Sequence, residues 1–352
     1  MVPRTRQAAM SGDVGVAVVG TGRAGMIHAR NYAAGTPDAR LVALADANRE
    51  ALDAAGRELG ITALYERPAD LLADPQVDAV VVVTPTNLHR DIVVTAARAG
   101  KHVFCEKPMA MNVAECESMI RACDEAGVKL QIGFMRRFDA SYQASHEQVL
   151  AGEIGEVNQI KSLTHGPSVP QPWMLDVARS NGPLAEVSSH DIDTVRWFAG
   201  SEIVEVYAVA GNFRCGDRAA EYPDFYDTFV MTCRFENGMQ AVIDGAVSVG
   251  YGYDARTEVL GSDGIILIGD LRADRVIRHR RGGAMEGRTT ASWRNLFVDA
   301  YRAEAAAFVE SIVNDTVPEV TGTDGLQAVR VVNAGNESIR TRSVVRIPEE
   351  AS

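Results

Sequence analysis

The 352-residue sequence predicts two domains of different classes: an α/β domain with a parallel, doubly wound sheet, then an α+β domain with a large open, mostly antiparallel sheet. Up to about residue 135, apolar runs typical of buried strands alternate with helical patterns, whereas later strand-like runs follow one another directly. The length also exceeds what one hydrophobic core usually organises. We expect a leader without periodicity at 1–13 and domains at 14–135 and 136–352, with a C-terminal segment able to pack back on the first domain.

Composition and charge exclude several classes of protein. Apolar residues make up 46% of the chain and charged residues 23%, as in ordinary globular proteins. The net charge of −12 repels phosphate backbones, so we expect no nucleic-acid partner. No run approaches the roughly 18 apolar residues that span a bilayer, and the N-terminus lacks an apolar signal core, so we expect no membrane association and a cytoplasmic location. The five cysteines lack metal-type spacing, which predicts reduced thiols.

The first predicted strand, Val14–Val19, runs directly into a glycine-rich turn that opens the helical pattern Met26–Ala34. In such a turn the first glycine allows a tight bend, the second lets the backbone approach a pyrophosphate, and the third lets the helix pack on the strand. The helix N-terminus then presents N–H groups to the anion. The turn residues assigned to a dinucleotide cofactor are Gly20, Thr21, Gly22, Arg23, Ala24 and Gly25.

An acid closes the next predicted strand. Leu41–Ala45 ends in Asp46, which follows Gly25 by 21 residues. A carboxylate at this distance accepts the ribose hydroxyls of an adenosine and repels a 2′-phosphate, which favours NAD over NADP. The order strand, glycine turn, helix, strand, acid indicates a Rossmann domain. The alternative is a glycine turn of another α/β unit followed by a helix-capping aspartate.

Two further strand ends carry polar groups. The run Val77–Val83 is apolar enough for the middle of a parallel sheet, and the turn after it is placed at the carboxyl edge, where such sheets bind ligands. The alternative is that the side chains of Asn87 and His89 in this turn cap the helix Leu88–Ala99. We assign to the cofactor Thr84, Pro85, Asn87 and His89, together with Glu106 and Lys107 at the next strand end and Arg136 further on.

Lys107 is one of only four lysines, and it lies between Glu106 and Pro108 at the end of an apolar run. Pro108 disfavours helical backbone angles at Lys107 and fixes how the chain leaves the strand. The ordinary alternative is a surface Glu–Lys pair. We favour a functional lysine because the glycine turn, the preceding loop and this dipeptide all lie at one edge of one sheet.

The second domain is predicted from consecutive strands, with Asn237-Gly238 as a hairpin turn. Within it, Pro183 and Gly200 delimit one predicted helix. Glu186 and His190 lie one turn apart on this helix, so a carboxylate can orient an imidazole that serves as general base. The alternative is a solvated polar face. Because no HExxH motif or cysteine set accompanies the histidine, we expect no metal.

These motifs together resemble the Gfo/Idh/MocA oxidoreductases. The similarity is carried by the glycine turn, Asp46, Glu106-Lys107-Pro108 and Gly182-Pro-Leu-x-Glu186-x-x-x-His190-x-x-Asp193, and covers nearly the whole chain after residue 14. Three further segments are similar to the inositol 2-dehydrogenase branch, namely Gly133–Asp139, Ala151–Glu156 and Tyr251–Asp254.

The resemblance implies an active site in a cleft between the domains and a homo-oligomer, usually a tetramer, formed through the open sheet. It implies that Lys107 positions a substrate hydroxyl and that His190 accepts its proton. Glu186 stands where the family usually has aspartate. The substrate-side residues that the resemblance implies are Lys107, His165, Glu186, His190, Tyr251 and Tyr253.

The resulting hypothesis is NAD-dependent oxidation of a secondary hydroxyl on a cyclic polyol, with inositol as first choice. One alternative is a sugar or glycoside 3-dehydrogenase, including enzymes of anhydrosugars or natural-product glycosides. Glu186 and the Pro/Trp loop Pro167–Trp173 motivate it, because that loop is suited to stack on a sugar ring. The same motifs would also suit a catalytically inactive NAD-sensing protein, or a redox-neutral glycosidase that holds NAD tightly.

Overall fold

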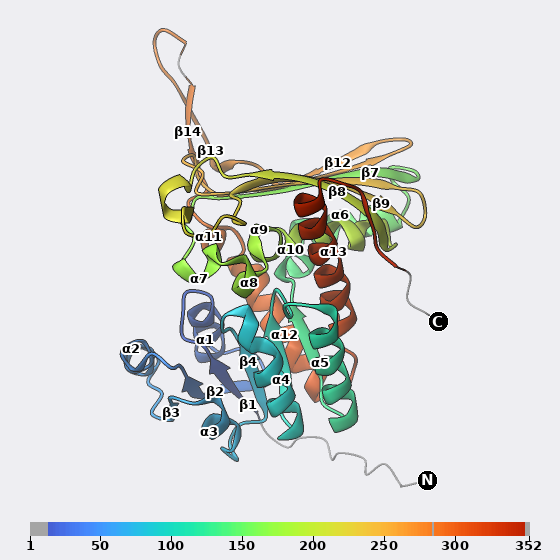
Figure 1. Ribbon diagram of the computed structural model, residues 1–352. Helices are drawn as coiled ribbons and strands as arrows, with labels where there is room; N and C mark the ends of the chain where they lie inside the picture. Colours follow the sequence, from blue (N-terminus) through green and yellow to red (C-terminus); the bar gives the residue numbers. More distant parts are fainter. Residues whose placement is uncertain (1–12, 284, 349–352) are drawn as a thin grey trace. The chain divides into compact units, whose positions relative to one another are not determined.

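The computed structural model describes residues 13–283 and 285–348, so the predicted leader, apart from Asp13, lies outside the described residues (Figure 1). The chain forms two compact units. Unit 1 comprises the described residues up to Glu106, Glu117–Gly133 and Tyr301–Gly322. Unit 2 comprises Lys107–Cys116, Phe134–Ala300 and the described residues from Thr323 on. None of the described helices is long and apolar enough to cross a membrane.

Unit 1 is built on a six-stranded sheet in the order β3-β2-β1-β4-β5-β6, in which every pair is parallel. This order is that of a doubly wound Rossmann sheet, which confirms the predicted class. Its strands are β1 Val14–Val19, β2 Ala39–Ala45, β3 Leu64–Tyr65, β4 Ala79–Val82, β5 His102–Glu106 and β6 Leu130–Gly133. The helices associated with them are α1 Gly25–Ala33, α2 Arg49–Leu59, α3 Pro68–Leu72, α4 His89–Arg98, α5 Val113–Ala126 and α12 Val298–Val313, with the 3-10 turn η1 Thr86–Leu88.

One face of this sheet is covered by α1 and α12. Alternate side chains of β1, such as Val16 and Val18, pack with Tyr32 of α1 and with Phe308 of α12. Because β1 is buried along its whole length, it reads as a continuous apolar run rather than an alternating one. A segment three hundred residues from the N-terminus thus completes the core of unit 1.

Unit 2 contains a seven-stranded sheet in the order β12-β11-β7-β10-β9-β8-β15. The pair β7–β10 is parallel and the other neighbours are antiparallel, which confirms the predicted mostly antiparallel sheet. Gly238 has φ +87° in the turn between β9 and β10, as expected for an Asn-Gly hairpin. The strands are β7 Val157–Gly166, β8 Ile203–Gly211, β9 Thr228–Phe235, β10 Gln240–Val247, β11 Asp254–Gly261, β12 Ile265–Ile268 and β15 Val345–Arg346.

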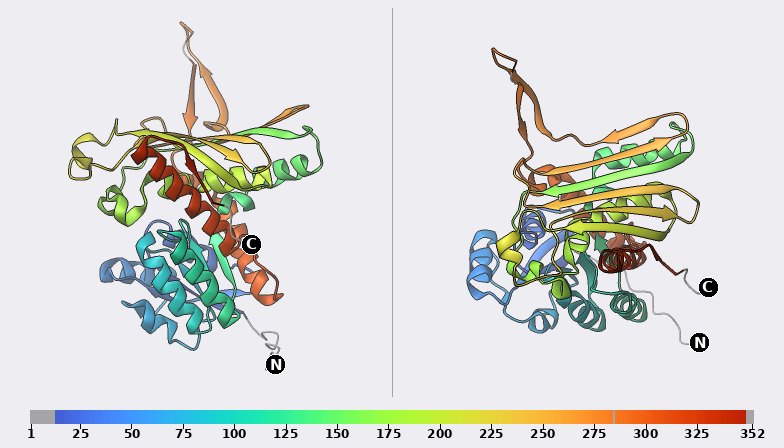
Figure 2. Two further views of the ribbon diagram at one scale, coloured as in Figure 1. Left: turned by 45° about the vertical axis from the view of Figure 1, so that its right-hand side comes forward. Right: turned by 45° about the horizontal axis from the view of Figure 1, so that its top comes forward.

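Helices lie over one face of this sheet, and the other face carries none in the described chain (Figure 2). On the helix-free face Val209, Val230 and Leu267 are exposed. A two-stranded ribbon, β13 Arg272–His279 and β14 Met285–Thr289, projects from the sheet (Figure 1) and was not predicted. The helices of unit 2 are α6 Ala140–Leu150, α7 Pro172–Leu175, α8 Val177–Ser180, α9 Gly182–Glu186, α10 Ser189–Ala199, α11 Trp293–Leu296 and α13 Gly322–Thr341, with 3-10 turns η2 Met135–Phe138 and η3 Gly216–Ala219.

Two helices predicted as continuous are each divided in two. The predicted helix from Pro183 to Gly200 consists of α9 and α10, because the backbone leaves helical geometry at Ser188 (φ −101°, ψ 10°), whose side chain makes no capping hydrogen bond. Gly200 does end α10 in the left-handed conformation, as predicted. The predicted helix Trp293–Val313 is interrupted at Phe297. The prediction that Glu186 and His190 share a face of one helix is therefore wrong.

Helix α10 is anchored by a buried ion pair. Asp193 accepts hydrogen bonds from Arg137 Nε at 2.9 Å and from Nη2 at 2.5 Å, and the same Nη2 lies 2.8 Å from Asp324 Oδ1 on α13. Both Arg137 and Asp193 are buried, so neither charge has bulk water as a substitute partner. Loss of Asp193 would leave Arg137 buried with Asp324 as its carboxylate partner, a weaker compensation of its charge.

We expect Asp193→Ala to lower the free energy of unfolding by up to about 3 kcal/mol, because the buried Arg137 loses two hydrogen bonds to Asp193 and keeps the one to Asp324. The measurement is the thermal unfolding midpoint by calorimetry. Asp70→Ala, which removes an exposed partner of Arg67, serves as the control and should leave the midpoint unchanged. Equal midpoints for Asp193→Ala and the wild type would show that the buried pair does not stabilise α10.

Candidate active site

The glycine turn of unit 1 has the geometry of a phosphate cradle. Gly20 has φ +100°, and a Cβ there would lie 2.4 Å from the carbonyl oxygen of Val83. A Cβ at Gly25 would lie 1.8 Å from the carbonyl oxygen of Gly20, whereas a Cβ at Gly22 would meet nothing within 4 Å. The outer glycines are thus required by the fold, and Gly22 keeps an open approach to the N-terminus of α1. This is the arrangement that a pyrophosphate needs.

Asp46 faces this turn from the end of β2. Its Oδ2 accepts hydrogen bonds from the backbone N–H of Thr21 at 2.7 Å and from Thr21 Oγ1 at 2.9 Å, and its Oδ1 accepts one from Asn48 N at 2.8 Å. The carboxylate is therefore fixed beside the cradle, where the ribose of an adenosine follows the pyrophosphate. The exposed Arg23 and the partly buried Ala24 complete the turn.

The turn after β4 is held by its own histidine. His89 is buried, and its Nε2 lies 2.8 Å from the carbonyl oxygen of Thr84. Leu88 N donates to the carbonyl oxygen of Pro85 at 2.9 Å, while Asn87 is exposed. Helix α4 has Leu88 as its N-cap residue without a side-chain cap, so the capping alternative is not observed. His89 shapes the loop through an imidazole–carbonyl contact.

Lys107 lies in unit 2, directly after the last residue of β5. Its Nζ donates a hydrogen bond to the backbone carbonyl of Glu186 at 2.8 Å, and the Lys107–Pro108 peptide bond is cis. This contact links the lysine to α9, the short helix that precedes the one carrying His190. The fold thus brings Lys107, Glu186 and His190 together. The contact that does so is the hydrogen bond from Lys107 to the backbone carbonyl of Glu186, and not a helix face shared by Glu186 and His190.

His190 is buried, with 6% of its surface exposed, and its ring meets that of Phe134 edge-on with centroids 6.1 Å apart. Burial lowers the pKa of His190 well below its ordinary value of 6.5, and the positive charges of Lys107 and Arg136 lower it further. The imidazole is therefore neutral at physiological pH and ready to accept a proton. Its Nδ1 has no hydrogen-bond partner among the described residues, so the Glu186 carboxylate does not orient the ring through that atom.

Arg136 is buried beside this histidine. Its Nη1 lies 2.7 Å from Asp191 Oδ1, and its Nη2 donates to Thr164 Oγ1 at 2.5 Å. Ser162 Oγ donates to the same Asp191 oxygen at 2.7 Å. These contacts lie wholly in unit 2, and the assignment of Arg136 to the cofactor stays a prediction. The sequence analysis did not identify Asp191. The available signal was its position directly after His190 in a predicted helix.

The remaining predicted substrate residues lie on different sides of the unit 2 sheet. Side chains alternate along β7, so Thr164 points to the helix-covered face and His165 to the open face. There His165 contacts the hydroxyl of Tyr251 and lies 3.1 Å from Asp244 Oδ1. Tyr253 is instead buried, with its ring edge-on to Phe297. His165 and Tyr251 thus form a cluster separate from the contacts of His190.

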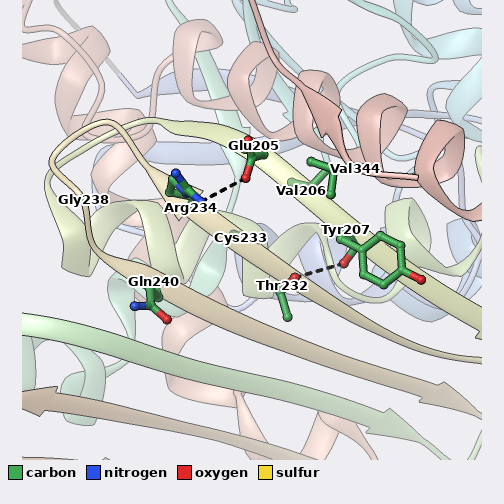
Figure 3. Close-up of a pocket in the computed structure, with 9 residues that line it drawn as sticks. All are labelled: Glu205, Val206, Tyr207, Thr232, Cys233, Arg234, Gly238, Gln240 and Val344. Carbon is green, nitrogen blue, oxygen red and sulfur yellow. Dashed lines mark hydrogen bonds and ion pairs between the residues drawn. The ribbon is translucent and has the colours of Figure 1, made fainter. Parts of the chain in front are cut away.

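A hollow over β8, β9 and β10 has a different character (Figure 3). Its polar contacts are an ion pair between Arg234 and Glu205 at 3.4 Å and a hydrogen bond from Thr232 to the carbonyl of Tyr207. It contains none of the residues predicted for cofactor or substrate. Among the described residues, no group of three His, Cys, Asp or Glu side chains is placed to hold a metal ion.

The two sets of residues define a class of protein. A Rossmann unit with an NAD-type cradle and acid, accompanied by a neutral buried histidine and a lysine, is typical of nicotinamide-dependent oxidoreductases. Residues 14–134 match the oxidoreductase family described as having an NAD-binding Rossmann fold, and residues 146–347 match the C-terminal α/β domain of the same family. The chain belongs to the Gfo/Idh/MocA oxidoreductase family and is an NAD-dependent oxidoreductase.

Its relatives include inositol dehydrogenases. Myo-inositol 2-dehydrogenase of Thermotoga maritima is 34% identical over 335 residues, which cover 95% of this chain and 98% of the relative. The scyllo-inositol 2-dehydrogenase (NAD(+)) of Bacillus subtilis is 33% identical, with 96% and 97% covered. The structure of scyllo-inositol dehydrogenase from Lactobacillus casei with bound NAD(H) and scyllo-inositol superposes with a TM-score of 0.87 at 30% identity, covering 95% and 99% of the two chains.

Gly22→Val tests the cradle. The side chain enters open space, so we expect the free protein to keep its thermal midpoint but to lose the stabilisation by NAD, about 2.7 kcal/mol at a hundredfold excess over Kd. Gly20→Ala, which forces a Cβ against Val83 at positive φ, should lower the midpoint even without NAD. A full NAD-induced shift in Gly22→Val would contradict the placement of the cofactor at this turn.

Proposed function

We propose that this enzyme is an inositol 2-dehydrogenase that oxidises a secondary hydroxyl of myo- or scyllo-inositol with NAD. The observation that carries the proposal is the neutral, buried His190 flanked by the charges of Lys107 and Arg136. The full-length similarity to myo- and scyllo-inositol 2-dehydrogenases supports inositol as the substrate. The residues assigned to the substrate by sequence, including Glu186, His165, Tyr251 and Tyr253, form part of the same proposal.

In the proposed reaction, Lys107 donates a hydrogen bond to the reacting hydroxyl and stabilises negative charge that develops on its oxygen. His190 accepts the hydroxyl proton and becomes an imidazolium. When bound, NAD supplies the acceptor for the hydride that leaves the same carbon. Because Lys107 and Arg136 disfavour the imidazolium, His190 readily returns its proton to solvent after turnover.

We also propose which part of the chain binds which ligand, and how the chain assembles. Residues 14–135 hold NAD and residues 136–352 contact the substrate. Lys107 is the exception within the first range, because it belongs to unit 2. The exposed apolar side chains on the open face of the sheet, such as Val209 and Val230, support a homo-oligomer, with a tetramer as the expected form. Five buried free thiols agree with a reducing cytoplasmic location.

The proposal predicts NAD reduction with inositols. The assay follows NADH formation with myo-inositol, scyllo-inositol, glucose and glycosides as substrates. We expect the inositols to be preferred, and His190→Ala to lower kcat by about 10²–10⁴, the usual contribution of a general base. His146→Ala, which removes a histidine stacked on Trp197, is the matched control and should retain activity.

Three results would overturn parts of this proposal. Activity on glycosides but not inositols would select a glycoside 3-dehydrogenase. Unchanged turnover in His190→Ala would remove the assigned base. Absence of NAD reduction with every polyol, despite NAD binding, would select a sensor without catalysis.

A further inference from the structure

Unit 1 contains a buried carboxyl group that the proposed reaction does not use. Glu304, on α12, has no exposed surface, and neither of its carboxyl oxygens has a hydrogen-bond partner among the described residues. A carboxylate in such surroundings would be far costlier than the neutral acid. Burial accordingly raises the pKa of Glu304 well above its ordinary value, and the nearby charge of Glu106 raises it further. Glu304 is therefore protonated at neutral pH.

Four elements meet around this acid. Glu106 closes β5, and its Oε1 lies 2.8 Å from Nε2 of His28 on α1. The His28 ring is edge-on to Tyr301, one turn before Glu304 on α12, with centroids 5.5 Å apart. From β6, Gln131 Nε2 donates to the backbone carbonyl of Glu304 at 3.2 Å. The buried acid thus belongs to the cluster that fixes Glu106 at the carboxyl end of the cofactor sheet.

This cluster holds other polar atoms without partners. Tyr32 Oη and His28 Nδ1 on α1 and Gln131 Oε1 on β6 are buried and make no hydrogen bond to described residues. The titratable groups that the described contacts place in this cluster include Tyr32 and His28 on α1, Glu106 on β5 and Tyr301 on α12, and Gln131 on β6 contributes a neutral amide.

We propose that Glu304 is a positioning residue for the end of β5. While uncharged it leaves the Glu106–His28 pair undisturbed, and when it ionises at alkaline pH it repels the Glu106 carboxylate from His28 and weakens NAD binding. The reason is that ligands of a parallel sheet bind at the carboxyl ends of its strands, where Glu106 lies. Two buried carboxylates that feel each other's charge disfavour simultaneous ionisation.

The sign of the effect on stability follows from linkage. A carboxyl pKa raised by folding means that the folded protein keeps a proton that the unfolded chain has lost. Between the two pKa values the free energy of unfolding therefore falls as pH rises. Glu304→Gln keeps the shape and removes this proton, so the ratio of folding constants, variant to wild type, should grow about tenfold per pH unit across that window.

The experiment compares wild type and Glu304→Gln in two measurements between pH 6 and 9.5. Thermal and urea unfolding without NAD give the folding constants, and calorimetric titration with NAD alone gives Kd. We expect the two folding constants to diverge with rising pH. We expect the wild-type Kd to rise at least tenfold once the acid ionises, while Kd of the variant changes by no more than about twofold.

Two outcomes would overturn the proposal. A constant ratio of folding constants would show that Glu304 has an ordinary pKa. Kd values that change together, or stay level together after the ratio of folding constants has stopped growing and Glu304 has therefore ionised, would show that its charge does not reach the cofactor site. Neither measurement uses inositol. If inositol proves not to be the substrate, the result of this test is therefore unaffected. Infrared detection of a protonated carboxyl band in wild type, absent from Glu304→Gln, gives a spectroscopic check of the same assignment.

Discussion

The hydrogen bond from Lys107 Nζ to the carbonyl of Glu186 is the interaction on which the proposed substrate site depends. It uses one of the three N–H donors of the ammonium to fix an otherwise flexible side chain. It also fixes a positive charge where that charge lowers the pKa of His190. The same hydrogen bond therefore fixes the position of Lys107 and the place from which its charge acts on His190.

Buried ion pairs keep the rest of this arrangement rigid. Arg136 pairs with Asp191 and Arg137 with Asp193, so two consecutive arginines hold the helix that carries His190. The positive charge of Arg136 also lowers the pKa of His190. A polar network of this kind is costly unless its members find partners, and it therefore permits few competing packings. The neighbours of the proposed base are accordingly specified more tightly than an apolar core would specify them.

The fold was largely predictable because its signals are local. Gly20, Gly22 and Gly25 predict the first turn, Asp46 follows at the expected distance, and hydrophobic runs predict the strands of both sheets. Two elements were predicted wrongly. Ser188 divides a helix that periodicity alone would continue, and its side chain makes no capping hydrogen bond, so the sequence carries no cap signal for this break. The β13–β14 ribbon carries too few apolar side chains to give a strand signal.

The sequence nominates the residues of the proposed site but not their geometry. Lys107 and His190 stood out by rarity and motif, whereas the contact between Lys107 and a backbone carbonyl leaves no mark in the sequence. Successive side chains of a strand point to opposite faces of the sheet, so His165 and Thr164 lie on different faces. Which face each side chain takes depends on the strand register. Glu304 gave no signal, since a glutamate in a helical pattern is normally solvated and only the packing of α12 on unit 1 buries it.

The most direct test of a base kept neutral by burial and by Lys107 is the pKa of His190, measured by NMR titration of histidine-labelled protein. We expect a wild-type pKa well below 6.5, a higher value in Lys107→Met, because one positive charge is lost, and a low value in Lys107→Arg, which keeps that charge. His190→Ala identifies the resonance. A wild-type pKa at or above 6.5, or one that Lys107→Met leaves unchanged, would contradict this role of Lys107 and the neutrality of His190.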